Sequence, residues 1–168
     1  VPDPDSEGRL TLPGGKQLAV YPMWPNLVRT STCDVEGPLI YGGDGTLEYL
    51  NGKPIKDSIV LLEYNSMGRW KNAAKLGAKA VVFVAPKQTI RSESEQKFST
   101  VPLNVPRFYL PLSEAGPVLN AAFRREKASL VCRQDWVSRD SCNLIAELPG
   151  SDPKAKDEPI VLFAYADS

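Results

Sequence analysis

The sequence contains no histidine among its 168 residues, and this absence limits the chemistry that its side chains can perform. Histidine is the commonest proton shuttle at neutral pH and a frequent zinc ligand. A Ser-His-Asp triad, a Cys-His pair and a histidine-ligated metal site are therefore excluded within these residues. A Gly-x-Ser-x-Gly elbow is also absent. Paired carboxylates stay open as acid–base groups. Asp and Glu fall mainly in hydrophilic, loop-like stretches, however, where we expect them to be solvated.

The three cysteines, Cys33, Cys132 and Cys142, permit one disulfide and leave one thiol over. Their spacing fits neither a zinc ribbon nor a redox Cys-x-x-Cys pair. Buried thiols are the favoured interpretation, and a Cys132–Cys142 bridge is the alternative. Cysteine usage therefore gives no indication of the compartment.

The string Gly42-Gly43-Asp44-Gly45-Thr46 resembles the phosphate-binding loops of lipid and NAD kinases. Such loops need a helix whose N-terminus faces the anion. Only four residues separate this string from the Asn51-Gly52 turn, so we expect no sustained helix, and a Walker-type lysine is absent. A glycine-rich turn between strands is the preferred interpretation. Phosphate or nucleotide binding at residues 42–46 is a weaker alternative.

The N-terminal stretch imitates the opening of a calcium loop through Asp3, Asp5, Glu7 and Gly8. The twelfth position of such a loop is Gly14, where a bidentate glutamate is needed. We therefore expect a solvated N-terminal arm over residues 1–17 rather than a calcium site.

The polar stretch at residues 87–100, with Ser92 to Lys97 at its centre, is predicted to be an exposed loop of a length that can bind partners. Trp24, Trp70 and Trp136 are widely spaced. We expect them to fill gaps in a core or interface rather than to form a stacking platform.

Charge and composition exclude several classes of protein. Lys plus Arg and Asp plus Glu are both 20, so the chain lacks the basic excess of a nucleic-acid-binding protein. Hydrophobic residues make up 42% and charged residues 24%, which is typical of a globular protein. The longest apolar run, residues 80–85, is far shorter than the roughly 18 residues of a membrane span.

Apolar runs and turn formers predict strands alternating with helices. The run at residues 59–63, the helical spacing of Met67, Trp70 and Ala74, and the run at 80–84 form a strand–helix–strand unit. Such a unit has parallel neighbouring strands and a right-handed crossover. In all we predict strands at residues 38–41, 59–63, 80–84, 106–110 and 130–136, and helices at residues 67–76 and 114–125.

The composition changes near residue 139, where we expect a domain boundary. The prediction is an arm at 1–17, a main domain at 18–138, and the first strands of a second domain at 139–168. Those strands are predicted at residues 143–148 and 159–163. Two strands are not stable alone in water, so they must pair with the main domain, another copy or a missing partner. The chain starts at Val1 without an initiator Met, which indicates a processed or excised piece.

Several segments of the main domain together resemble the protease-associated (PA) domain. Residues 37–43, 59–62 and 73–83 match its glycine-flanked strand, its buried strand and its helix ending in Gly-Ala. Residues 105–109 and 116–119 fit its later strand and helix. The resemblance implies an α/β (α+β) fold, an open β-barrel or sandwich with two flanking helices.

The segment at residues 143–153 is similar to the opening of the catalytic domain in di-zinc aminopeptidases, the relatives of glutamate carboxypeptidase and the transferrin receptor. The next strand of that family ends in Gly-Ala-His-x-Asp-Ser, and the matching residues here are Ala164-Tyr165-Ala166-Asp167-Ser168. Tyr165 stands at the position of the ligand histidine, and Asp167 at that of the aspartate that orients the ligands. A phenol must lose a proton of pKa near 10 before it can bind zinc.

The resemblance thus implies no catalytic, metal-binding or cofactor-binding residue in this chain, because the family's other functional residues follow this point. It implies a non-catalytic PA-type domain of a zinc aminopeptidase-like protein, which covers an active site or makes substrate or protein contacts. Its partner would be the peptidase-like domain of a longer parent, or a protein or peptide. The alternative is a truncated piece of an active di-zinc aminopeptidase, where zinc would belong to the parent. An extracytoplasmic or secreted location is also implied.

Overall fold

The computed structural model describes residues 3, 5–23, 31–98, 103–140, 142–148, 151 and 160–164, and of residue 98 only the backbone. The chain divides into two compact units, Val1–Ser138 and Arg139–Ser168. All the helices and strands that the structure describes lie in the first unit.

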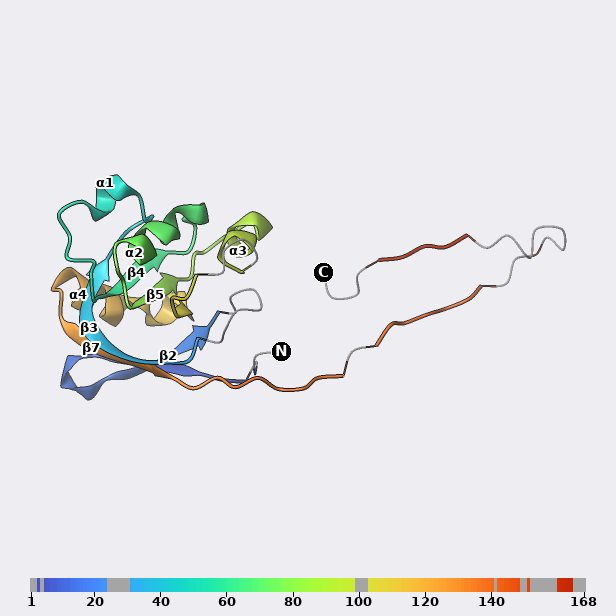
Figure 1. Cartoon of the computed structure of the whole chain (residues 1–168), viewed down its shortest axis with the longest axis horizontal. Coiled ribbons are helices and arrows are strands. Elements are labelled where there is room, and N and C mark those ends of the chain that lie inside the picture. Colours follow the sequence, from blue (N-terminus) through green and yellow to red (C-terminus); the bar gives the residue numbers. More distant parts are fainter. Residues whose placement is uncertain are drawn as a thin grey trace. The chain divides into compact units, whose positions relative to one another are not determined.

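The first unit is built around a closed β-barrel (Figure 1). The strands are β1 Gly8–Thr11, β2 Gln17–Pro22, β3 Cys33–Tyr41, β4 Ile59–Glu63, β5 Ala80–Val84, β6 Arg107–Leu110 and β7 Lys127–Cys132. Their order around the barrel is β1-β2-β6-β5-β4-β3-β7. The pairs β3-β4, β4-β5 and β5-β6 are parallel, and the pairs that involve β1, β2 or β7 are antiparallel.

Four α-helices connect the strands, and three 3-10 turns accompany them in the described part of the unit. The helices are α1 Leu47–Leu50, α2 Lys71–Lys75, α3 Arg91–Phe98 and α4 Ala115–Phe123. The 3-10 turns are η1 Pro13–Gly15, η2 Met67–Trp70 and η3 Leu112–Glu114. Among the residues that the structure describes, no helix has the length and apolarity needed to cross a bilayer.

Alternate side chains of the parallel strands enter two separate cores. Ile59 and Leu61 of β4 belong to the core that contains the buried face of α4. Val60 and Leu62 of the same strand belong to the second core, together with Trp70. Strands that are buried on both faces need continuous apolar sequences, and this explains the runs in β4 and β5.

The predicted mixed α/β barrel with two flanking helices is confirmed. The helices predicted at residues 67–76 and 114–125 correspond to η2 with α2 and to η3 with α4. The barrel is closed, whereas an open barrel or sandwich was predicted, because β7 pairs with both β1 and β3.

The N-terminal segment is part of the barrel rather than a solvated arm over residues 1–17. β1 pairs with β2 and with β7, and Leu10 is fully buried. The alternation of Leu10, Leu12, Leu18 and Val20 places apolar side chains inward, and all four contribute to the barrel core. Polar residues lie between these apolar positions in the sequence, and they led to the prediction of a solvated arm instead of a strand.

The polar stretch at residues 87–100 was predicted to be a loop, but it contains the helix α3. Glu93 and Lys97 lie four residues apart on this helix, and both are buried. They form an ion pair inside the protein, so the buried face of this helix is made by charged side chains rather than by apolar ones.

The strands predicted at residues 143–148 and 159–163 are not formed where the second unit is described, at residues 142–148 and 160–164. The apolar side chains Leu144, Ile145 and Leu148 are 86–95% exposed. Strands need a layer that covers them, and the described residues of this unit form none. Tyr165 and Asp167 lie outside the described residues.

Candidate functional site

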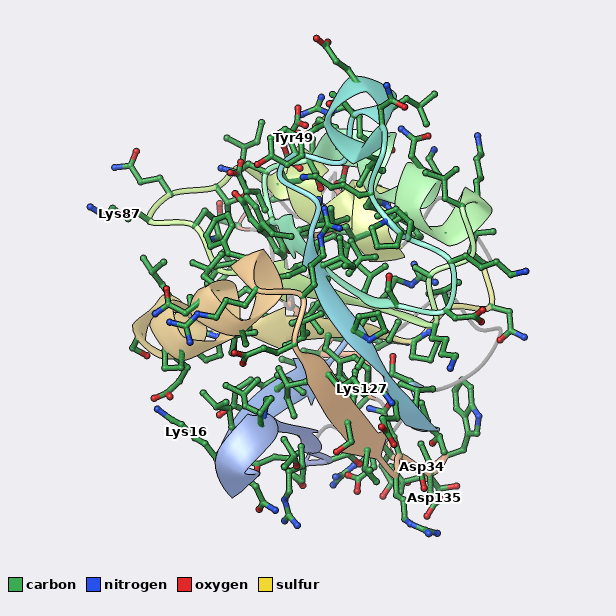
Figure 2. The ribbon with its side chains drawn as sticks, turned by 90° about the vertical axis from the view of Figure 1, so that its left-hand side faces the viewer. Lys16, Asp34, Tyr49, Lys87, Lys127 and Asp135 are labelled. Carbon is green, nitrogen blue, oxygen red and sulfur yellow. The ribbon has the colours of Figure 1, made fainter. Side chains whose placement is uncertain are left out.

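An exposed cluster of aromatic side chains lies where β3 and β4 end. Tyr41 is the last residue of β3, Tyr49 belongs to α1, and Phe123 is the last residue of α4. The ring of Tyr41 lies 5.9 Å from that of Tyr49 in an edge-on arrangement and 5.1 Å from that of Phe123. We call these three residues the aromatic patch. Figure 2 shows Tyr49 near α1, well away from Asp34 near the start of β3.

The local structure holds the patch in place. Thr46 caps α1 by accepting a hydrogen bond from the Tyr49 amide, which fixes the short helix beside β3. The Tyr41 hydroxyl donates to Oε1 of Glu63, the last residue of β4, at 2.8 Å. Tyr49 is 42% and Phe123 65% exposed. Aromatic side chains held rigidly at a surface are typical of protein or peptide contacts.

Positive charge borders the aromatic patch. The Lys53 ammonium lies 3.6 Å from the centre of the Tyr49 ring and donates to the Tyr41 carbonyl at 2.8 Å. Burial lowers the pKa of Lys53, and the nearby Arg125 lowers it further. A partner that carries carboxylates would relieve this repulsion between the two cations.

The Tyr41 hydroxyl of the aromatic patch stays protonated. Burial raises the pKa of Tyr41 far above its usual value, and the hydrogen bond to Glu63 raises it further. Tyr41 is therefore a neutral hydrogen-bond donor across the whole neutral range.

A pocket of about 680 Å³ lies beside α1. Its lining combines the exposed apolar side chains Leu47 and Leu76 with Lys53 and Lys56. Because Lys53 also borders the aromatic patch, the two features share one positively charged side chain.

The polar groups of the glycine-rich turn beside α1 form hydrogen bonds and an ion pair within the protein. The carboxylate of Asp44 accepts a hydrogen bond from the Thr46 amide and pairs with Arg69 at 3.3 Å. The Gly45 amide donates to the Gly42 carbonyl, and the Gly45 carbonyl accepts from Asn72. Two of the amides that a phosphate loop would offer are thus already used, and a carboxylate lies among them. α1 has only four residues, so the geometry gives no support to phosphate binding at residues 42–46.

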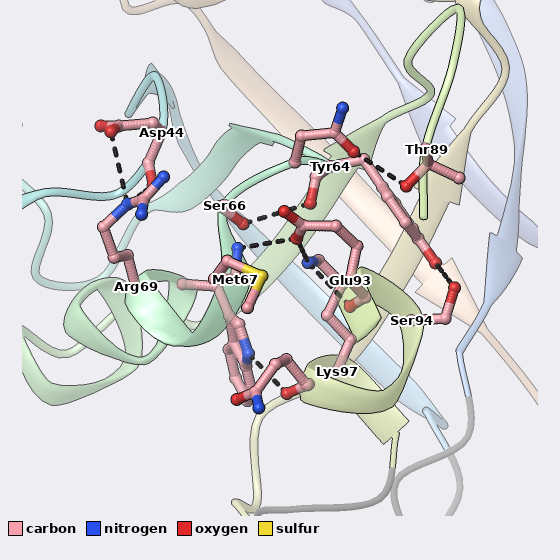
Figure 3. A network of polar contacts seen from close by, with 12 residues as sticks. Asp44, Tyr64, Ser66, Met67, Arg69, Thr89, Glu93, Ser94 and Lys97 are labelled. Carbon is pink, nitrogen blue, oxygen red and sulfur yellow. Dashed lines mark hydrogen bonds and ion pairs between the residues drawn. The ribbon is translucent and has the colours of Figure 1, made fainter. Parts of the chain in front are cut away.

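A buried ion pair fastens α3 to the barrel (Figure 3). Oε2 of Glu93 accepts from the Met67 amide at 2.7 Å and from the Lys97 ammonium at 2.9 Å. The same ammonium lies 4.7 Å from the centre of the Tyr64 ring. Burial lowers the pKa of Lys97, and Glu93 opposes this shift.

Arg107 secures the C-terminal end of the same helix. Its guanidinium donates to the carbonyls of Lys97 at 2.6 Å and Leu103 at 3.0 Å, and it lies 4.7 Å from the centre of the Trp70 ring. Burial lowers the pKa of Arg107 to about 10. Lys97 and Arg107 are both enclosed and hydrogen-bonded within the protein, so they link α3 to the elements around it. Trp70 is fully buried as predicted, Trp136 is 51% exposed, and Trp24 lies outside the described residues.

The described residues offer no donor set that fits a zinc ion. Within them, no group of three or more Cys, Asp and Glu side chains is arranged to hold a metal. Cys33, Cys132 and Cys142 are all free thiols, of which Cys132 is buried and Cys142 exposed. The expectations for Tyr165 and Asp167 stay predictions.

Sequence reasoning did not identify the aromatic patch. The one available signal was Phe123, which was assigned to the apolar face of the helix at 114–125 and emerges exposed at its end. Tyr41 and Tyr49 are close in sequence, but their edge-on contact depends on the turn between them.

Comparisons with known proteins place the barrel in a structural context. No protein-family model and no curated protein sequence matches the chain. Among solved structures, the chain is similar to an aminopeptidase from Aneurinibacillus sp. strain AM-1, with a TM-score of 0.50 and 22% identity, covering 77% of this chain and 30% of that one. It is also similar to the psychrophilic subtilisin-like protease Apa1 from the Antarctic psychrotroph Pseudoalteromonas sp. AS-11, with a TM-score of 0.51 and 15% identity, covering 75% of this chain and 32% of that one.

These similarities concern the fold. The first unit is a PA-like mixed α/β barrel, and its fold is related to parts of peptidases. The chain spans about a third of the length of the peptidases it matches.

Proposed function

We propose that this chain is a non-catalytic PA-type domain of a zinc aminopeptidase-like protein. It covers an active site or guides substrate peptides, and it does so through contacts made by the aromatic patch. The observation that carries the proposal is a complete PA-like barrel that presents Tyr49 and Phe123 to solvent and contains no histidine. The likeness of this barrel to parts of two peptidases supports the class of parent.

The second unit supports a larger partner. Its apolar side chains Ile160, Val161, Leu162 and Phe163 are 75–92% exposed. Such a cluster is costly in water and is expected to be covered by another layer of structure. We infer that this layer is a peptidase-like domain, since residues 143–153 are similar to the start of one. The same similarity favours a location outside the cytoplasm.

Two matched tyrosines test the role of the aromatic patch. Tyr49 is 42% exposed in the patch, and Tyr21 is 43% exposed on β2. An isotope-labelled sample of the chain is titrated with an unstructured peptide rich in aromatic and acidic side chains and followed by NMR. We expect the shifted resonances to cluster at Tyr41, Tyr49 and Phe123. Tyr49→Ala should weaken binding at least about tenfold, and Tyr21→Ala should leave it unchanged. Shifts scattered over the barrel, or equal effects of the two variants, would reject the patch as the contact surface.

The second candidate function is a piece of an active di-zinc aminopeptidase. The segment at 143–153 favours it as much as it favours an inactive relative. The two candidates differ in the coding sequence that follows residue 168. Histidine, aspartate and paired glutamates in a zinc pattern would favour the enzyme, and further substitutions such as Tyr165 would favour the non-catalytic protein.

A further inference from the structure

Two of the three cysteines face each other across neighbouring strands. Cys33 is the first residue of β3, and Cys132 is the last residue of β7. These strands are antiparallel, and the two cysteines are direct partners in their register. Figure 1 shows β3 and β7 side by side along one wall of the barrel. In the sequence the two residues are almost a hundred positions apart, so their spacing gave no sign of the pairing.

Both side chains lie on the inner face of the wall. Successive residues of a strand point to opposite faces, and the neighbours Asp34 and Val131 are the exposed ones. Cys132 is 1% exposed within the barrel core, and Cys33 packs against that core. The Cys33 thiol lies 3.7 Å from the Leu130 carbonyl and donates to it.

The register satisfies the geometry of a disulfide. Directly opposed residues of an antiparallel pair have Cα atoms roughly 4.5–5.5 Å apart. Disulfides span Cα separations of about 4.4–6.8 Å. Both cysteines are at strand ends, where small backbone shifts can bring the sulfurs together. On its other side Cys132 faces Gly8 of β1, so of its two register partners Cys33 is the one with a side chain.

We propose that Cys33 and Cys132 form a disulfide that joins β3 to β7 when the chain folds in an oxidising environment. The oxidant is a small-molecule disulfide such as oxidised glutathione. The Cys33 thiolate attacks one sulfur of the oxidant, and the first glutathione thiolate leaves. The Cys132 thiolate then attacks the Cys33 sulfur of the mixed disulfide and releases the second thiolate. The protein loses two protons and two electrons, and one molecule of oxidant becomes two thiols.

The bond would be structural rather than catalytic. Burial raises the pKa of Cys33 to about 12, and the neighbouring Cys132 adds to this shift. Burial also raises the pKa of Cys132. Thiolates are therefore scarce in the folded, reduced chain, so exchange with small thiols is slow once the barrel has formed. The bond is expected to form during folding and to persist afterwards, as in proteins outside the cytoplasm.

Peptide mapping tests the pairing directly. The full chain is refolded from denaturant with excess oxidised glutathione, its remaining thiols are alkylated under denaturing conditions, and it is digested without reduction for mass spectrometry. We expect one linked peptide pair containing Cys33 and Cys132, with Cys142 alkylated. A link between Cys132 and Cys142, or alkylation of all three cysteines, would overturn the proposal.

Variants and melting temperatures give a second measurement. Cys142→Ser should keep the Cys33–Cys132 link, and this control needs no change in the barrel. The oxidised wild type should melt roughly 5–15 °C above the reduced one, because the bond restrains the unfolded chain between β3 and β7. Cys33→Ser should melt at the same temperature with and without reductant. A wild-type melting temperature that does not respond to reductant would contradict the proposal, even if Cys33→Ser fails to fold.

Discussion

Removing the carboxylate of Glu93 should destabilise the chain far more than removing a matching carboxylate on the same helix. Glu93 and Lys97 are an i,i+4 pair with side chains 8% and 0% exposed, at 2.9 Å. Arg91 and Glu95 are an i,i+4 pair at 2.8 Å with side chains 82% and 49% exposed. The two pairs have nearly the same spacing and length, so they differ chiefly in burial.

The expected magnitudes follow from that difference. Glu93→Ala leaves the Lys97 ammonium buried without its partner and leaves the Met67 amide without its acceptor. Breaking a buried pair in this way costs about 3–5 kcal/mol of unfolding free energy. Glu95→Ala breaks a solvated pair, and its cost should be below about 0.5 kcal/mol.

The assay is urea unfolding followed by the fluorescence of the tryptophans, since Trp70 is buried beside α3. The pH dependence adds a signature that a mere packing defect lacks. Without Glu93 the pKa of Lys97 falls further below its unfolded value, so the unfolded state binds more protons and stability rises with pH. The loss of unfolding free energy in Glu93→Ala should therefore shrink as the pH rises toward about 10.4, the pKa of lysine in the unfolded chain. Equal costs for the two variants, or a deficit independent of pH, would refute the assignment of Glu93 and Lys97 as a buried structural link.

Three further predictions concern the aromatic patch, the reduced cysteines and the second core. Phe123→Ser should change the unfolding free energy by less than about 1 kcal/mol, because the side chain is 65% exposed, yet weaken peptide binding at least about tenfold by NMR titration. In the reduced chain, the raised pKa of Cys33 gives stability that is present below pH 9 and is lost toward pH 12. Urea unfolding at successive pH values should therefore show that Cys33→Ser loses less unfolding free energy than the wild type over this range. Trp70→Ala should cost about 3–5 kcal/mol, because it empties a fully buried site and removes the ring beneath Arg107; a urea midpoint within error of wild type would count against this packing.

The elements that the sequence predicts well are those with an unambiguous burial pattern. β4 and β5 are continuous apolar runs, and α4 has its buried residues at helical spacing. Helix α3 has no such pattern, because its buried face consists of the ion pair of Glu93 and Lys97. That pair is tolerated only because Tyr64, Phe83 and the Met67 amide surround it, and these groups come from other elements.

The candidate site is harder to predict for the same reason. The aromatic patch joins Tyr41, Tyr49 and Phe123 from β3, α1 and α4, and no local spacing connects the last of these with the others. The opposition of Cys33 and Cys132 likewise depends on the register of β3 and β7. In contrast, the lack of histidine is visible at once, and it restricts the catalytic chemistry before any fold is known.

The most direct test of the central claim is a peptidase assay on the chain itself. The full chain is incubated with zinc and a series of aminoacyl and dipeptide reporter substrates, with and without a chelator. We expect no turnover that the chelator abolishes, because the chain has no histidine and its described residues hold no metal-ligand cluster. Chelator-sensitive turnover that copurifies with the folded chain would contradict the proposal that this chain is a non-catalytic PA-type domain.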